Sequence, residues 1–240
     1  MKSINIIAVM QPYIFPHLEY FQLIHATDMF VIFDDVCFMK RSYITRNKIA
    51  VKNAAYRFSV PVMSASQNKL IKDLKVNPDL SLLKTLKHSY SKAPHFNTVF
   101  PLLQAVMLYP DDNLARFVTN SLQVVCRYLE IDTQFCYSSQ IPLIVTGRDK
   151  IIPLCHHFSA GTYVNKEGGV MIYDSKTFEK EHILLRFVKS KVTYERVNGF
   201  IPNLSIIDML MFNSVDQIQQ HLKKYQLLSK DELLRDNETL

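Results

Sequence analysis

Two short apolar runs on either side of a helical pattern constrain the fold of this chain more than any other feature. Residues 5–10 (NIIAVM) form a β-branched run that ends at a Gln-Pro pair, and residues 30–33 (FVIF) form a second run that ends at two aspartates. Between them, apolar residues recur at helical spacing over residues 17–29. Strand, helix and strand within about 30 residues match the size of a βαβ unit, so we expect the two strands to be parallel.

Strand-like and helix-like segments keep alternating along the rest of the chain. They predict an α/β fold of the Rossmann-like type, with a partly parallel sheet, additional α-helices and a helical C-terminal region. The further strands that we expect lie at residues 57–62, 134–137, 161–164 and 183–188, and residues 70–76 should form a short strand or helix. The further helices that we expect lie at residues 80–88, 99–109, 114–129 (capped by Asp111 and Asp112), 149–158, 178–181, 205–212 and 215–227.

The domain organisation follows from the length and from the position of the polar end. A chain of 240 residues can bury one sizeable core, and we expect a single α/β domain over residues 1–230. This division leaves room for a smaller helical lobe near residues 78–130. Residues 231–240 are mostly polar and are expected to form a frayed tail.

The composition excludes several classes of protein. Four cysteines without a CxxC pair are too few for a disulfide scaffold, and we expect no metal site. The N-terminus does not resemble a secretory signal, and no apolar run reaches about 18 residues, so we expect no membrane span and a cytoplasmic location. The 28 basic and 22 acidic side chains give a formal net charge of +6, which suits an anionic partner such as a nucleotide, a sugar nucleotide or RNA.

Polar side chains follow the first predicted strand. Ligands of parallel α/β sheets bind where loops leave the carboxyl ends of strands, and this loop carries Gln11 and Tyr13 before a helix that begins near His17 and Tyr20. The arrangement is similar to the strand–loop–helix of nucleotidylyltransferases, although the glycine and the second histidine of their H-x-G-H element are absent here. Taken singly, His17 could instead cap the helix and Tyr20 could belong to the core.

The second strand ends at two aspartates, whose side chains should point to opposite faces. We expect Asp34 to enter the site as a catalytic base, while a turn capped by Asp34 and Asp35 is the structural alternative. Arg46 and Asn47 follow in a polar loop. A guanidinium there could bind phosphate through two hydrogen bonds, and the amide could recognise a sugar.

Titratable groups also gather at the end of a predicted helix. We expect His88 to accept a proton, and Tyr90 and Lys92 to bind an anion, while stabilisation of the helix C-terminus is the alternative. Asp208 lies in a Ser-x-x-Asp pattern that is typical of a helix N-terminus, and a place in the substrate site is its second interpretation.

Ordered groups of these residues resemble the WbqC-like protein family, over residues 10–213. The most specific group is Met10-Gln11-Pro12-Tyr13, Pro16, Tyr20-Phe21, Asp28, Phe33-Asp34-Asp35-Val36 and Arg46-Asn47. The others are Tyr90-x-Lys92-Ala93-Pro94-x-Phe96, Gly161-x-Tyr163 with Gly168-Gly169, and residues 204–210 (LSIIDML). Where family members tend to have Trp-x-Gly-Tyr, this chain has His17-Leu18-Glu19-Tyr20, so we prefer Gln11, Tyr13 and Tyr20 to His17 as site residues.

The resemblance implies a bacterial protein of O-antigen or other surface-polysaccharide (lipopolysaccharide) biosynthesis. The reaction it favours is the transfer of an acyl or aminoacyl group, such as glycyl, to the amine of an amino-sugar nucleotide. The activated donor is open between ATP, an aminoacyl-tRNA and an acyl-CoA, so tRNA or another carrier is a candidate partner and a homodimer a candidate assembly. A nucleotidyltransferase-like enzyme and a non-catalytic sugar-nucleotide-binding protein are the alternatives.

Such a transfer needs a base, donors for the developing oxyanion and an anchor for phosphates. We expect His88 or Asp34 to accept the amine proton and Arg46 with Lys92 to hold the phosphates. The expected hydrogen-bond donors are Gln11, Tyr13 and Asn47. The substrate site is completed by Tyr20, Tyr90 and Asp208.

Overall fold

The two strands of the predicted βαβ unit lie side by side in the computed structural model, which describes residues 4–192 and 201–238. β1 (Ile6–Met10) pairs in parallel with β2 (Met29–Ile32), and α1 (Leu18–His25) joins them. The register runs from Ile7 opposite Met29 to Met10 opposite Ile32. The predicted order of elements and the parallel pairing are therefore confirmed.

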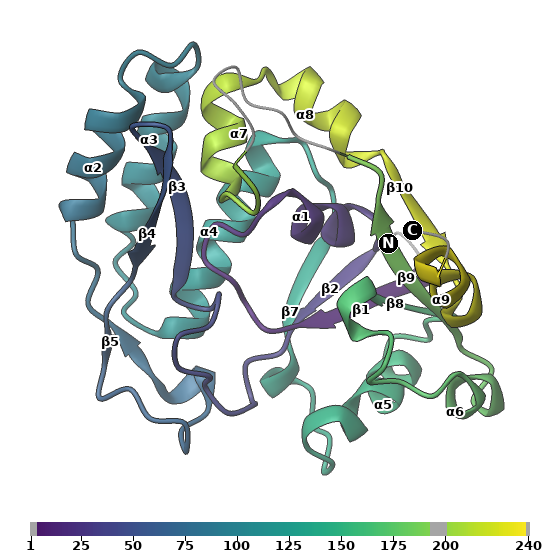
Figure 1. Cartoon of the computed structure of the whole chain (residues 1–240). Helices are drawn as coiled ribbons and strands as arrows, with labels where there is room; N and C mark the ends of the chain where they lie inside the picture. The colour runs from purple at the N-terminus through teal and green to yellow at the C-terminus, as the bar shows by residue number, and fades with distance from the viewer. Residues whose placement is uncertain (1–3, 193–200, 239–240) are drawn as a thin grey trace.

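These strands belong to a six-stranded sheet, the largest formed by the described residues, in the order β10-β9-β8-β1-β2-β7 (Figure 1). All neighbouring strands are parallel except the edge strand β10, which runs antiparallel to β9. The remaining strands of this sheet are β7 (Gln134–Tyr137), β8 (Thr162–Lys166), β9 (Leu184–Ser190) and β10 (Tyr225–Leu228). The predicted α/β class with a partly parallel sheet is confirmed.

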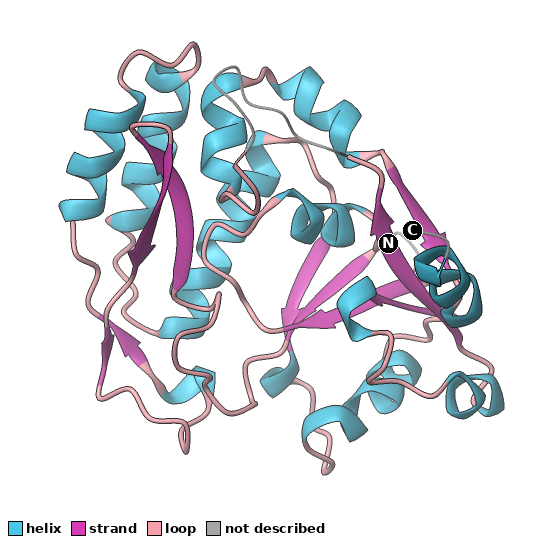
Figure 2. Cartoon of the chain, in the orientation of Figure 1, coloured by secondary structure: helices cyan, strands magenta, loops and turns pink. Residues whose placement is uncertain are grey.

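Helices cover both faces of this sheet (Figure 2). Successive side chains of a strand point to opposite faces, so Ala8 packs into one hydrophobic core while Ile7 and Val9 pack into another. The first core includes residues of α1, α4 (Leu114–Tyr128), α7 (Ile206–Phe212) and α8 (Val215–Leu222). The second includes residues of α5 (Ile151–His157), α6 (Ser175–Lys180) and α9 (Lys230–Glu238). Burial on both faces explains why the central strands are almost continuously apolar.

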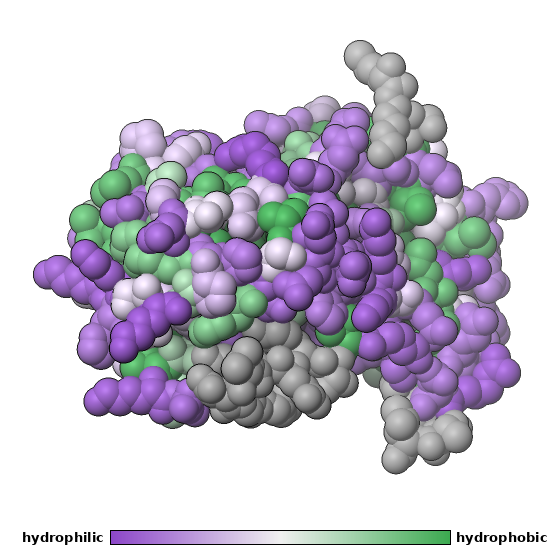
Figure 3. Space-filling model, turned by 90° about the horizontal axis from the view of Figure 1, so that it is seen from above, coloured by the Kyte–Doolittle hydropathy of each residue, from purple (hydrophilic) through white to green (hydrophobic). Residues whose placement is uncertain are grey.

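A further layer extends the first core on one side of the molecule (Figure 1). It contains the hairpin of β3 (Arg46–Val51) and β4 (Ala54–Ser59), with α2 (Ser81–Tyr90) and α3 (Phe96–Met107) beside it. A small sheet pairs β5 (Val62–Met63) with β6 (Lys75–Val76). Short 3-10 turns occur at Ile71–Asp73, Ser138–Gln140, Gly147–Lys150 and Glu167–Gly169. Seen from above, hydrophilic side chains surround smaller groups of hydrophobic ones (Figure 3).

The segment that contains Arg46 and Asn47 is a strand rather than the polar loop that we expected. β3 pairs with β4 over its whole length, and the strand expected at residues 57–62 is divided between β4 and β5. Its side chains alternate, because Asn47 and Ile49 are buried while Arg46 and Lys48 are partly exposed. Hydropathy alone does not reveal this alternation, because the buried Asn47 is as polar as the basic side chains on either side of it.

The C-terminal region also differs from the expectation. The helix expected at residues 215–227 ends at Leu222, and Tyr225–Leu228 instead pairs with β9. Residues 231–240, expected to form a frayed tail, are helical up to Glu238, and the side chain of Leu233 is 0% exposed. Ser229 and Glu232 begin this helix, since the Ser229 N–H donates to the Glu232 carboxylate at 2.7 Å and the Glu232 N–H donates to the Ser229 hydroxyl at 3.3 Å.

The N-terminus of α4 is capped one residue later than expected. The Asn113 side chain, rather than Asp111 or Asp112, accepts a hydrogen bond from the Arg116 N–H at 3.1 Å. Asp111 instead accepts from the Asn113 N–H at 2.9 Å and pairs with the Arg116 guanidinium. The aspartate therefore holds the capping residue in place.

Candidate functional site

The strand order locates the place where a ligand would enter this fold. From β1 the chain adds β2 and β7 on one side and β8, β9 and β10 on the other, which is the order of a Rossmann doubly wound sheet. The loops after β1 and β8 therefore leave in opposite directions and open a crevice between them. A cleft of about 540 Å³ lies at this point, and we call it the switch-point cleft. Its lining residues are Val9, Met10, Gln11, Tyr13, His17, Glu19, Phe33, Tyr43, Asn165, Lys166, Glu167, Gly168, Gly169, Ile172 and Tyr173.

Aromatic rings form one wall of the switch-point cleft. The ring of Tyr13 lies 5.2 Å from that of Tyr20 and 5.7 Å from that of Tyr43. Burial, together with the neighbouring Tyr43, raises the pKa of Tyr13, so its hydroxyl keeps its proton at neutral pH. The fully buried Tyr20 donates a hydrogen bond at 2.6 Å to the carbonyl of Gln11. Tyr20 thus fixes the backbone of the first loop and lies beneath the cleft rather than in it.

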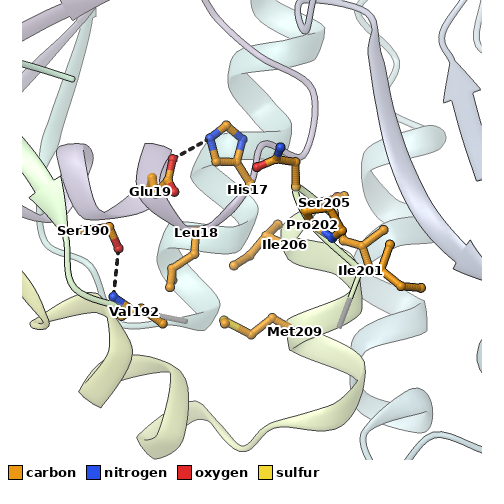
Figure 4. Close-up of a pocket in the computed structure, with 12 residues that line it drawn as sticks. His17, Leu18, Glu19, Ser190, Val192, Ile201, Pro202, Ser205, Ile206 and Met209 are labelled. Atoms are coloured by element: carbon orange, nitrogen blue, oxygen red, sulfur yellow. Dashed lines mark hydrogen bonds and ion pairs between the residues drawn. The ribbon is translucent and has the colours of Figure 1, made fainter. Parts of the chain in front are cut away.

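A histidine, a glutamate and a lysine meet at one side of the same cleft. His17 Nε2 lies 3.1 Å from Glu19 Oε2 (Figure 4) and 2.9 Å from Lys166 Nζ. The hydrogen bond from His17, with help from Lys166, lowers the pKa of Glu19 to about 2, so this carboxylate is ionised at neutral pH. Burial lowers the pKa of Lys166, and the charge of Glu19 partly offsets this effect. A neutral His17 can accept from Lys166, and a protonated one can donate to Glu19.

The loop after β8 is held by a buried network of hydrogen bonds. Asn165 Nδ2 donates to the hydroxyls of Tyr163 at 2.9 Å and Tyr173 at 3.2 Å, and its Oδ1 accepts from the Lys166 N–H at 2.7 Å. A Cβ atom at Gly169 would lie 3.1 Å from Asn165 Oδ1, closer than ordinary contact. Glycine at this position therefore lets the loop fold back against Asn165 and keeps Lys166 at the cleft.

A second, largely apolar pocket lies on the other side of α1. His17 and Glu19 border both pockets, and Leu18, Ile206 and Met209 point into the second one (Figure 4). Its wall includes Val192 and Ile201, which flank the residues outside the described ranges. For this reason the candidate site is confined to the switch-point cleft and its neighbours.

Asp34 lies outside the switch-point cleft and is only 3% exposed. Its carboxylate accepts hydrogen bonds from the Ser138 hydroxyl at 3.1 Å, the Ser139 N–H at 3.0 Å and the Ser139 hydroxyl at 2.7 Å. The neighbouring Asp35 forms a buried ion pair with Lys150. The two aspartates thus tie the end of β2 to the turn after β7, which is a structural use of both carboxylates, and the role of Asp34 as a base stays a prediction.

Arg46 and Asn47 lie beside the cleft but play different parts. Asn47 is 2% exposed, and its Nδ2 donates to the carbonyls of Ile14 at 3.1 Å and Phe15 at 2.8 Å, so it holds the proline-rich loop after β1. Arg46 lines a pocket of about 280 Å³, which we call the basic pocket. Its lining residues are Arg41, Ser42, Tyr43, Arg46, Asn47, Lys48 and Arg57. Tyr43 lines both the basic pocket and the switch-point cleft.

The remaining predicted residues lie elsewhere. His88 and Lys92 are exposed and line another pocket, between the end of α2 and the turn of the β3–β4 hairpin. Tyr90 is 1% and Asp208 0% exposed. The Tyr90 hydroxyl donates to Asp208 Oδ1 at 2.9 Å and accepts from the Ala50 N–H at 3.0 Å. This buried pair links α2, β3 and α7, and neither residue lines the cleft.

The structure therefore brings together Gln11 and Tyr13 in the cleft, with Tyr20 packed beneath Tyr13 and with Arg46 and Asn47 beside the cleft. It places Asp34, His88, Tyr90, Lys92 and Asp208 elsewhere. Sequence reasoning undervalued His17 and missed Glu19, Tyr43, Asn165 and Lys166, all of which line the cleft. One signal was available, since Asn165 and Lys166 follow the strand expected at residues 161–164. That loop forms a wall of the cleft only because β8 lies beside β1, and no local sequence pattern predicts this pairing.

No helix among residues 4–192 and 201–238 is both long and apolar enough to cross a lipid bilayer. Within the same ranges, no three histidine, cysteine, aspartate or glutamate side chains are grouped so as to hold a metal ion. The four cysteines are all free thiols.

The fold and the cleft define an α/β protein with Rossmann strand order and a candidate ligand site at its switch point. The chain belongs to the WbqC-like protein family, whose match covers residues 11–220. It is 27% identical over 225 residues to the uncharacterized protein Rv1507c of Mycobacterium tuberculosis (strain ATCC 25618 / H37Rv). The aligned region covers 90% of this chain and 97% of the relative. No solved structure matches the chain. Membership of the family suggests a role related to polysaccharide biosynthesis.

Proposed function

We propose that this protein binds an amino-sugar nucleotide in the switch-point cleft and transfers an acyl or aminoacyl group, such as glycyl, to its amine. The product would serve the biosynthesis of a bacterial surface polysaccharide such as O-antigen. The observation that carries the proposal is that aromatic rings, a lysine and a histidine–glutamate pair meet in one cleft at the switch point. Family membership supports the choice of pathway.

The first step is recognition of the sugar nucleotide. The rings of Tyr13 and Tyr43 offer apolar faces on which a base or a sugar can pack. The ammonium group of Lys166, held near Glu19 at 3.6 Å, supplies a positive charge at the edge of the cleft. A mostly apolar wall with a few fixed polar groups is the usual composition of a small-molecule site.

The chemical step is an exchange of one bond at the acyl carbon. The sugar amine attacks the carbonyl of the donor, a C–N bond forms, and the C–O or C–S bond to the carrier breaks. His17 takes the proton of the attacking amine at Nε2 and returns it to the leaving oxygen or sulfur. The Tyr13 hydroxyl and the side-chain amide of Gln11 donate hydrogen bonds to the oxyanion that develops on the carbonyl oxygen. In this scheme His17 replaces His88 and Asp34 as the base.

The donor, its carrier and the assembly belong to the same proposal. An acyl-CoA, an aminoacyl-tRNA or an acyl group activated by ATP would each supply the acyl carbon and the C–S or C–O bond that breaks in this step. A cytoplasmic location is proposed because nucleotide-activated sugars are its substrates. Two copies of the chain could form a homodimer, which the step itself does not require.

The proposal is tested by mass spectrometry of UDP- and dTDP-amino sugars incubated with the protein and with each class of donor. We expect a mass gain equal to the acyl group with one donor. His17→Gln should reduce turnover at least about 100-fold, because a general base typically contributes that much, and should leave sugar-nucleotide affinity within a few-fold. His88→Gln, on the exposed end of α2, is the matched variant and should leave turnover unchanged.

Three results would contradict the proposal. Loss of turnover in His88→Gln with full activity in His17→Gln would show that the base lies in the pocket of His88 and Lys92. Incorporation of a nucleotide from labelled NTP into a sugar phosphate would identify a nucleotidyltransferase. Calorimetric binding of the sugar nucleotide without a mass gain for any donor would identify a non-catalytic binding protein.

A further inference from the structure

The basic pocket beside the switch-point cleft concentrates positive charge. Arg41, Arg46, Lys48 and Arg57 all line it, and none of its described lining residues is acidic. Within residues 4–192 and 201–238, none of these four side chains forms an ion pair or a hydrogen bond with an acidic group. By contrast, Lys150 and Arg116 each pair with an aspartate.

The register of the β3–β4 hairpin adds electrostatic repulsion between these basic side chains. Lys48 of β3 lies directly opposite Arg57 of β4, and Arg46 lies two residues before Lys48 on the same face of the strand. Like charges directly opposite each other destabilise an antiparallel pair. In addition, Arg41 adopts a φ of +63°, in the left-handed region that an arginine seldom occupies. Two cations therefore face each other across the hairpin and a third lies beside them on the same face, and a bound anion would offset their mutual repulsion.

We infer that the basic pocket binds a diphosphate group, of a ligand whose other end lies in the switch-point cleft. Guanidinium groups match phosphate oxygens through paired hydrogen bonds, and several cations together suit a polyanion better than a single carboxylate. Tyr43 connects the two sites because it lines both, and its ring lies 5.9 Å from the ring of His17. A diphosphate anchored here would therefore place the rest of its ligand next to the histidine.

The identity of the ligand rests on the proposed function, whereas the binding of diphosphate does not. The diphosphate could be that of the sugar nucleotide or that of a separate donor, such as a nucleoside triphosphate or a coenzyme A thioester. Both sources carry the same chemical group. Competition between inorganic pyrophosphate and a UDP-sugar distinguishes them: mutual exclusion indicates the sugar nucleotide, and simultaneous binding indicates the donor.

The experiment measures binding of inorganic pyrophosphate to the whole chain by calorimetry and by the shift of the melting temperature, at low salt and without any sugar nucleotide. We expect binding that weakens as salt is added, because screening reduces the attraction between charges. Arg46→Gln and Arg57→Gln should each weaken it by about tenfold or more. Arg127→Gln, an exposed arginine on α4, is the matched control and should leave pyrophosphate affinity unchanged.

A second readout separates ligand binding from a structural role. Without pyrophosphate, Arg57→Gln should keep or raise the melting temperature, since it removes the repulsion with Lys48. A clear fall in that temperature would instead show that Arg57 stabilises the hairpin. Equal affinity of the wild type and the Arg46→Gln/Arg57→Gln variant for pyrophosphate, or no binding to the wild type, would overturn the inference whatever the outcome for the sugar nucleotide.

Discussion

Polar side chains near the cleft differ in whether the protein itself uses their hydrogen-bonding atoms. Both ends of the Asn47 amide form hydrogen bonds with backbone groups. Its Nδ2 donates to the carbonyls of Ile14 and Phe15, and its Oδ1 accepts from the Lys48 N–H. Arg46, one residue earlier, points to the other face of the strand and lines the basic pocket. The two residues look equally suited to a ligand in the sequence, because residue type does not reveal which atoms are already bonded.

The role of Asp34 gives a prediction at this scale. Asp34→Ala leaves the Ser139 N–H and the Ser139 hydroxyl without their buried acceptor, while the Ser138 hydroxyl keeps its hydrogen bond to Asp35, so the free energy of unfolding should fall by about 2–3 kcal/mol. Urea denaturation measures this loss, and calorimetry of the folded variant should show sugar-nucleotide affinity close to that of the wild type. An unchanged unfolding free energy together with lost turnover would return Asp34 to the catalytic site.

At the scale of the element, strong local patterns identified the central strands and most helices but missed β3, β10 and α9. The helix of α4 was evident from its apolar period, whereas Tyr225–Leu228 became a strand because β9 offers it a free edge. The helix α9 could have been predicted from Ser229 and Glu232, which have the spacing of a capping box. Its polar composition conceals Leu233, which alone is fully buried among its described side chains.

The packing of α9 is testable through that leucine. Leu233→Ala should lower the free energy of unfolding by about 2–4 kcal/mol, because it leaves a cavity in the core beneath β9. Asp231→Ala, on the exposed side of the same helix, should cost about 0.5 kcal/mol through the helix dipole alone. Equal, small losses in both variants, measured by urea denaturation, would indicate that this end of the chain is frayed after all.

At the scale of the whole molecule, the strand order decides where the site lies. The parallel pairing of β1 and β2 follows from their spacing, since a short helix connects them. The position of β8 beside β1 brings together residues about 155 apart in the sequence, such as Ile6 and Thr162, and no local signal specifies it. The loop after β8, with Lys166, could therefore be found as a loop but could not be recognised as one wall of the cleft. The position of Lys48 opposite Arg57 likewise depends on the register of the β3–β4 hairpin.

The central claim concerns the place of the sugar nucleotide, and a crystal structure of the protein with a bound UDP- or dTDP-amino sugar tests it most directly. We predict that the ligand lies between the loops after β1 and β8, in contact with Tyr13 and Lys166, with its amine near His17 Nε2. Electron density for the sugar nucleotide in the pocket of His88 and Lys92, with the switch-point cleft filled only by water, would contradict the account.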